Sequence, residues 1–300
     1  MMKLVLFVLI LLSQIKAFAQ TTIKSSTAYL GETPPGMTPV KFAPGVISLP
    51  DQHEFGSVFS RDGHECYYAV DIKGRAEIRY MQLKKGQWTK PVTILTDPLF
   101  SYNDPMLSPD QNRLYFISDR PVVGSADKKD YDIWYVKRKG DRWSAPVNAG
   151  KAINSGRHEY YVSFSNSGTM YFSSNSHANE KRTDNFDIYA ASCVNDEFGQ
   201  PVPLPDAINT VAYEADVFVA GDESYLIFCA ARADGYGAGD LYISFRKRDG
   251  TWTNAKNMGD RINTPGHELC PFVTADGKYL FYTSSRDIYW IDARVIDTFR

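Results

Sequence analysis

Long apolar segments are scarce in this chain of 300 residues. The unbroken apolar run from Leu4 to Leu12 is too short to span a bilayer as a helix, and no later segment is long enough, so no membrane span is expected in the mature chain. Lys3 precedes that run, and Ala17-Phe18-Ala19 follows it with small residues where signal peptidase cleaves. We therefore expect residues 1–19 to be a signal peptide and the mature protein to be exported, periplasmic or secreted; a membrane anchor is the alternative.

Cysteine is also sparse. The four cysteines are widely separated: Cys66, Cys193, Cys229 and Cys270. An exported protein can form disulfides, but four cysteines in a chain of this length are not a disulfide framework. We expect buried free thiols rather than a specific pair.

Neither sign of charge is in excess, because 33 Lys and Arg face 35 Asp and Glu for a net charge of −2. No basic field is present to attract nucleic acid, so nucleic-acid binding is disfavoured. The sequence also lacks a Gly-x-Ser-x-Gly elbow, a His-Glu-x-x-His motif and a phosphate-binding glycine loop. No cofactor is expected. Tyr (19) and Phe (17) are plentiful, which favours strands over helices.

The chain repeats itself roughly every 50 residues. Five apolar runs each open on an acid, at intervals of 50, 55, 55 and 54 residues, and the acids are Glu54, Asp104, Glu159, Glu214 and Glu268. A turn such as Ala-Asp-Gly, a second apolar run, a third run opening on Asp-Ile-Tyr or a similar triplet, and a fourth run follow in phase. Each unit therefore predicts four short antiparallel strands, which is the repeat of a β-propeller.

The fifth unit lacks its fourth strand, since the chain ends at Arg300 soon after Asp287-Ile-Tyr-Trp290. The segment Pro39–Ser48 matches the fourth runs of other units, so we expect it to complete the last blade and close the ring. The prediction is an all-β, five-bladed propeller over residues 38–300, preceded by an extended lead-in over residues 20–37. A six-bladed ring is the alternative, but residues 20–50 are too few to supply a sixth blade.

These units resemble the TolB-like, WD-repeat-like (PD-type) propeller family, whose signature is an acid, an apolar strand, Ser-Pro-Asp-Gly and a second strand ending near Ser-x-Arg. Ser108-Pro109-Asp110 followed by Leu114–Arg120 is the nearest copy, and Ala275-Asp276-Gly277 is next. The third and fourth units depart from the pattern in this turn. The opening Tyr29–Gly36 is similar to the lead-in of exported propellers of Bacteroidetes-type bacteria. The resemblance implies the fold strongly and an activity weakly.

Within such a ring, one face carries the fourth-to-first and second-to-third connections. The sequence places three kinds of candidate ligand-binding residue there: the five acids above; Arg120, Arg232 and Arg286 at the ends of second strands; and Asn154, Asn209 and Asn263 of the Ile-Asn pairs. Insertions at 121–131, 176–186 and 233–239 should raise a rim over part of this face.

Each group also has a structural interpretation. An acid that every blade needs usually accepts backbone hydrogen bonds or pairs with an arginine, and asparagine holds turns through its side chain. His53, His158 and His267 each precede an acid, but adjacent strand residues face opposite sides, so no metal site is expected.

Two functions compete. The first is an exported, non-catalytic propeller, monomeric, that binds a glycan, a peptidoglycan fragment or a protein at the channel face. The alternative is a glycoside hydrolase with paired carboxylates at the channel mouth: Glu159, Glu214 and Asp216. Asp216 lies two residues after Glu214, so both should face one side of their strand and raise each other's pKa.

Overall fold

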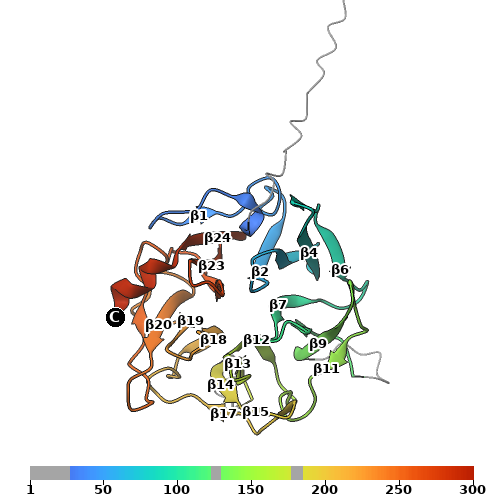
Figure 1. Ribbon diagram of the computed structural model, residues 1–300. Helices are drawn as coiled ribbons and strands as arrows, with labels where there is room; N and C mark the ends of the chain where they lie inside the picture. The colour runs from blue at the N-terminus through green and yellow to red at the C-terminus, as the bar shows by residue number, and fades with distance from the viewer. Residues whose placement is uncertain (1–27, 123–129, 177–184) are drawn as a thin grey trace, which may run out of the picture.

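The computed structural model describes residues 28–122, 130–176 and 185–300. The predicted signal peptide (1–19), residues 20–27 of the lead-in and most of the insertions at 121–131 and 176–186 lie outside the described residues. Five antiparallel sheets surround a central axis, as Figure 1 shows. The predicted all-β, five-bladed propeller is confirmed.

Blades 1 to 4 follow one another along the chain, and each has four strands counted outward from the axis. Blade 1 contains β2 (His53–Phe59), β3 (Glu65–Asp71), β4 (Ala76–Lys84) and β6 (Val92–Leu95). Blade 2 contains β7 (Asn103–Leu107), β8 (Arg113–Ser118), β9 (Asp132–Lys139) and β11 (Val147–Asn148). Blade 3 contains β12 (Glu159–Phe164), β13 (Met170–Ser174), β14 (Asp187–Ala191) and β17 (Val202–Pro203). Blade 4 contains β18 (Tyr213–Val219), β19 (Tyr225–Ala231), β20 (Asp240–Phe245) and β21 (Lys256–Asn257).

Blade 5 joins the two ends of the chain. Its inner strands are β22 (Leu269–Val273), β23 (Tyr279–Ser284) and β24 (Asp287–Asp292), and its outer strand is β1 (Val40–Lys41). β1 runs antiparallel to β24, with Lys41 opposite Tyr289. Next to this strand, Phe42 is fully buried and its ring contacts Phe59 of blade 1 as well as Phe281 and Trp290 of blade 5. The N-terminal segment therefore closes the ring by backbone pairing and by aromatic packing.

The ring has two unlike faces. We call the face with the second-to-third and fourth-to-first connections the loop-rich face, and the opposite one the turn face. On the turn face, two hairpins lengthen the third strands of neighbouring blades: β4 continues into β5 (Gln87–Trp88), and β9 into β10 (Arg142–Trp143). In blade 3 the third strand ends at Ala191, and a separate short hairpin follows, formed by β15 (Cys193–Val194) and β16 (Glu197–Phe198).

Every innermost strand contains a β-bulge. The register of each first strand against its second strand shifts at the same place, and the residue there has a positive φ. These residues are Gly56 (φ 59°), Asp104 (49°), Tyr161 (41°), Asp216 (52°) and Cys270 (53°). A bulge adds one residue to a strand and turns the side chains beyond it, so simple alternation along these strands fails after two residues.

Both ends of the described part of the chain pack against the ring. Part of the lead-in forms the 3₁₀ turn η1 (Tyr29–Gly31), and the ring of Tyr29 packs edge-on against Phe59 and Tyr279. After β24, the 3₁₀ segment η2 (Ala293–Phe299) buries Val295 and Ile296. No helix in the described residues has the length and apolarity needed to cross a bilayer.

Candidate functional site

Three of the predicted acids hold the fourth-to-first loops in place. In Glu268, one carboxylate oxygen accepts from the backbone N–H of Thr264 (2.9 Å), and the other accepts from the hydroxyls of Thr264 and Ser284 (both 2.7 Å). Glu159 receives the same set from Ser155 and Ser174, and Glu214 receives it from Thr210 together with Arg232. All three carboxylates are fully buried. Their carboxylate oxygens therefore already accept hydrogen bonds from the protein itself.

Glu54 lacks such partners because the residue four positions earlier is Pro50, which has neither a hydroxyl nor an N–H. Its two carboxylate oxygens are buried and reach no hydrogen-bond partner among the described residues. Burial raises its pKa from the ordinary 4.5 to about 7.

Asp104 does not occupy the position that its spacing predicts. The backbone N–H groups of Glu54, Tyr102, Glu159, Glu214 and Glu268 each donate to the carbonyl that precedes or opens the third strand of the preceding blade. The equivalent of the four glutamates in blade 2 is therefore Tyr102, and the alignment of Asp104 with them is off by two residues. Asp104 stands at the bulge instead.

Each of the three predicted asparagines is hydrogen-bonded to the backbone of a third strand. The side-chain oxygen of Asn154 accepts from Ile133 N–H (2.8 Å) while its amide nitrogen donates to Ile133 C=O (2.9 Å). Asn209 and Asn263 make the same pair of bonds to Ile188 and Leu241. In each asparagine, the side-chain oxygen and the NH₂ group are both bonded to the third strand. The asparagines therefore fix the loops of the loop-rich face and are not available to bind a ligand.

The three predicted arginines have different surroundings. Arg232 pairs with the buried Glu214 (3.0 Å) and stacks over the Tyr242 ring. Arg120 lies over the Trp134 ring and donates to the Tyr102 hydroxyl (3.3 Å). Arg286 is exposed. The structure therefore does not bring the arginines into one cluster.

Two bulge acids face each other across the axis. The Cys270 thiol donates to Asp104 Oδ1 (3.4 Å), and the Cys270 backbone N–H donates to Asp216 Oδ2 (3.4 Å), so one residue of blade 5 touches acids from blades 2 and 4. Both acids are more than nine-tenths buried. Burial, followed by the charge of Asp216, raises the pKa of Asp104 to about 8, and burial raises that of Asp216.

This geometry corrects the predicted pairing of Glu214 with Asp216. The bulge between Ala215 and Phe218 turns Asp216 toward the axis, whereas Glu214 points into its own loop. Burial raises the pKa of both acids, but the acid that interacts with Asp216 is Asp104 and not Glu214. Glu159 and Glu214 are each fully buried and bound to a different loop, so they do not form an open pair of carboxylates.

Thiols and imidazoles add no recognisable chemical centre in the part of the chain that the structure describes. All four cysteines are free thiols. The Cys229 sulfur lies 3.2 Å from His267 Nε2, but burial raises the pKa of the Cys229 thiol well above its ordinary value, which disfavours a nucleophilic thiolate. Within the described residues, no group of three or more His, Cys, Asp or Glu side chains could hold a metal ion.

A row of aromatic side chains crosses the loop-rich face from the start of the third strand of blade 2 to the first strand of blade 4. It spans blades 2 to 4 and consists of Tyr131, His158, Tyr160, Phe186 and Tyr213. Neighbouring ring centroids are 5.2–5.9 Å apart, and His158 stacks on Tyr160 with their planes 13° apart. Four of the five rings are partly exposed. Here and below, the name aromatic row means these five residues.

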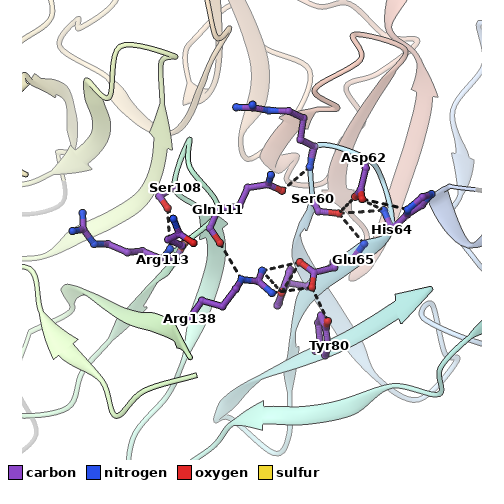
Figure 2. A network of polar contacts seen from close by, with 12 residues as sticks. Ser60, Asp62, His64, Glu65, Tyr80, Ser108, Gln111, Arg113 and Arg138 are labelled. Atoms are coloured by element: carbon purple, nitrogen blue, oxygen red, sulfur yellow. Dashed lines mark hydrogen bonds and ion pairs between the residues drawn. The ribbon is translucent and has the colours of Figure 1, made fainter. Parts of the chain in front are cut away.

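Sequence reasoning missed a polar cleft on the turn face. A cavity of about 780 Å³ opens between blades 1 and 2, and Figure 2 shows its polar network. Its floor is an ion pair across the two blades, in which Arg138 of β9 donates two hydrogen bonds to Glu65 of β3 (3.0 and 2.8 Å). The sequence does not indicate that Arg138 and Glu65 pair, because the two residues belong to different blades. The one related feature of the sequence is the hairpin turn before Trp88 and Trp143.

A second, smaller cavity of about 340 Å³ lies at the junction of blades 2 and 3. Tyr115, Tyr135 and Phe198 line it, and Arg113 pairs with the exposed Asp196 there (2.9 Å).

Five four-stranded blades closed by an N-terminal strand define a five-bladed β-propeller. Solved structures similar to the chain include a protein of unknown function from Dyadobacter fermentans (14% identity, TM-score 0.52, covering 87% of this chain and 84% of that one). They also include TolB from Acinetobacter baumannii (12%, 0.50, covering 79% and 53%) and a putative TolB from Agrobacterium tumefaciens (14%, 0.47, covering 76% and 69%). The chain thus spans about half of the Acinetobacter protein. At these identities the likeness to the Dyadobacter and Acinetobacter structures shows the fold alone.

No family model matches the chain, and no curated protein matches it.

Proposed function

We propose that this protein is an exported, non-catalytic binding propeller that takes a glycan, a peptidoglycan fragment or a protein partner at its loop-rich face. The observation that carries the proposal is the aromatic row, which lies partly exposed on the loop-rich face, whereas Glu159, Glu214 and the asparagines are hydrogen-bonded within the scaffold. Partly exposed Tyr and His rings offer stacking area and polar tips at low conformational cost.

The scaffold residues have a supporting role in this proposal. The buried glutamates and asparagines fix the loops beside His158 and the strand that carries Tyr160, so the ligand meets a rigid surface. Arg286, which is exposed on the same face, is the predicted arginine best placed to reach a ligand. Export rests on the signal-peptide sequence of residues 1–19.

Glycoside hydrolysis is the alternative and would require two carboxyl groups about 5–10 Å apart that a substrate can reach. Among the described residues, no arginine or lysine is bonded to the two axial acids, Asp104 and Asp216, but each acid is less than a tenth exposed. The alternative therefore needs the axis to open above them.

Substitution in the aromatic row tests the proposal. The mature protein and its Tyr160→Ala variant would be screened on a glycan array, on peptidoglycan sacculi and by crosslinking to envelope proteins. Loss of one stacking ring should weaken binding by about tenfold. Tyr289→Ala, on the third strand of blade 5 and outside the aromatic row, is the matched control and should bind as the wild type does.

Two results would contradict the proposal. One is ligand binding that Tyr160→Ala leaves unchanged. The other is turnover of a bound glycan that disappears in Asp104→Asn or Asp216→Asn, which would establish the hydrolase instead.

A further inference from the structure

The polar cleft on the turn face is built by two neighbouring blades. Blade 1 contributes its first-to-second turn and part of β4: Ser60, Arg61, Asp62, His64, Glu65, Gln82 and Leu83. Blade 2 contributes Asp110, Gln111, Asn112 and Arg138. The β4–β5 and β9–β10 hairpins lengthen the third strands on this side of the ring, and β4 and β9 contribute to the lining. Its volume of about 780 Å³ is within the range of small-molecule sites.

The floor of the cleft is rigid. Besides its two bonds to Glu65, Arg138 donates to the Gln111 carbonyl (3.1 Å) and stacks on the Trp143 ring (4.6 Å). Glu65 also accepts from the hydroxyls of Tyr80 (2.8 Å) and Tyr67 (3.1 Å). Burial alone would raise the pKa of Glu65, but the bonds from Arg138 and Tyr80 outweigh it and hold that pKa below the ordinary 4.5. A charged pair bound on all sides needs nothing from a ligand.

The walls, in contrast, present polar groups that no other described residue uses. Within the described part of the chain, the side-chain amide of Gln82 takes part in no hydrogen bond. Gln111 uses only its side-chain oxygen, which accepts from Arg61 N–H (2.8 Å), and this leaves its NH₂ available. Arg61 donates to the Pro109 carbonyl (2.9 Å) from one nitrogen of its guanidinium. The free groups are thus amide and guanidinium N–H donors together with amide oxygen acceptors, from both walls.

The charges in the cleft favour neither an anion nor a cation. Two arginines and three carboxylates line it. Glu65 is neutralised by Arg138, and His64 Nδ1 lies 3.3 Å from Asp62 Oδ2. Beside the Glu65–Arg138 pair, an anionic ligand would meet Asp62 and Asp110, and a cationic ligand would meet the Arg61 guanidinium. Leu83 is the one apolar side chain in the described lining, so a lipid or an apolar peptide side chain would find little surface to bury.

From these observations we propose that the cleft between blades 1 and 2 binds a neutral saccharide, one or two sugar rings in size. Vicinal hydroxyls are both donors and acceptors, and they match the mixed, planar amide and guanidinium groups of Arg61, Gln82 and Gln111. Binding here is independent of the aromatic row, which lies on the opposite face of the ring.

The Ser60, Asp62 and His64 side chains do not form a catalytic triad. Ser60 Oγ donates to Asp62 Oδ1 (2.6 Å) and not to the imidazole, so the imidazole cannot take its proton. The same hydroxyl-to-carboxylate bond recurs in the first-to-second turns of blade 2, from Ser108 to Asp110 (2.5 Å), and of blade 5, from Thr274 to Asp276 (2.7 Å). This bond stabilises the turn and gives no sign of catalysis, so we treat the cleft as a binding site.

Gln82→Ala tests this site with little risk to folding, because the side chain has no partner within the described structure. Gln87→Ala is the matched control: it is the same residue type on the same hairpin, exposed and outside the cleft. Cellobiose, maltose and N,N′-diacetylchitobiose would be titrated, up to about 10 mM, into the mature protein and both variants, with saturation-transfer NMR as the readout. Glucose 6-phosphate and glucosamine serve as the charged probes.

We expect at least one neutral disaccharide to bind and Gln82→Ala to weaken it by about fivefold, while Gln87→Ala and Tyr160→Ala leave it unchanged. Three results would overturn the proposal: no signal from any neutral disaccharide, equal binding by Gln82→Ala and the wild type, or tighter binding of glucose 6-phosphate or glucosamine than of the neutral sugars. If Tyr160→Ala alone removes the signal, the sugar binds at the loop-rich face instead, which also overturns it.

Discussion

At the scale of single residues, the position four places before each first-strand acid decides the state of that acid. Where it is Ser or Thr, as at Thr264, a hydroxyl and an N–H satisfy the carboxylate. Where it is Pro50, the carboxylate of Glu54 is buried with no partner among the described residues. Where it is Pro98, the acid itself is replaced by Tyr102. An unsatisfied buried acid is costly in its ionised form and much less so when protonated.

Glu54 should therefore make the stability of the protein depend on pH. Its pKa is raised to about 7, so the native state holds a proton that the unfolded chain has released above about 4.5. The stability contributed by this proton is complete below the unfolded pKa and is lost as pH rises to about 7. Glu54→Gln cannot ionise, so it should match the wild type at acidic pH and exceed it by about 1–3 kcal/mol at alkaline pH.

Urea denaturation of both proteins, below about pH 5 and above about pH 8, measures this difference. Glu268→Gln is the matched comparison, because it removes an acceptor from Thr264 and should destabilise by about 2 kcal/mol at both values. A Glu54→Gln variant that is less stable than the wild type at alkaline pH would show that the carboxylate has a partner.

At the scale of elements, the bulge in each first strand determines which residues face the axis. The five bulge residues share a positive φ but no chemistry, because they are Gly, Asp, Tyr, Asp and Cys. The sequence therefore offers no signal for the bulge, and alternation assigns Asp216 to the wrong side. Strand number, order and turns were predictable, since they follow from apolar alternation and turn residues that recur in every unit.

Gly56→Ala tests the geometry of the bulge. An added Cβ would lie 3.0 Å from Asp104 Oδ1 and 3.1 Å from Asp104 Cα, in addition to the cost of φ +59°. Gly277 has φ +69°, and a Cβ added there would meet nothing within 4 Å, so Gly277→Ala isolates the backbone cost of about 1 kcal/mol. We expect Gly56→Ala to lose roughly 2–3 kcal/mol in urea denaturation. Equal losses in the two variants would mean that blades 1 and 2 do not meet closely at the bulge.

At the scale of the whole molecule, closure of the ring was readable from the sequence, because the missing fourth strand of the last unit matched the segment at Pro39. The turn-face cleft was not readable. Arg138 and Glu65 are 73 residues apart and pair only because neighbouring blades bring β9 beside β3. The sequence repeat predicts the features that all blades share. It does not predict a site formed by residues that occur in only two of the blades.

The most direct test of the closed ring, on which both proposed sites depend, is a cross-link between its two ends. Lys41 and Tyr289 lie directly opposite each other on β1 and β24, so Lys41→Cys with Tyr289→Cys brings two Cα atoms within disulfide range. The control pair, Lys41→Cys with Asp292→Cys, is out of register by about three residues, roughly 10 Å along the strand.

On oxidation, the in-register pair should form a disulfide, seen by mass spectrometry and by faster migration on a non-reducing gel. Because it closes a loop of about 250 residues, it should also raise the free energy of unfolding by up to about 5 kcal/mol. If both introduced thiols of the in-register pair stay free after oxidation, or if the control pair forms the disulfide instead, the ring described above is contradicted.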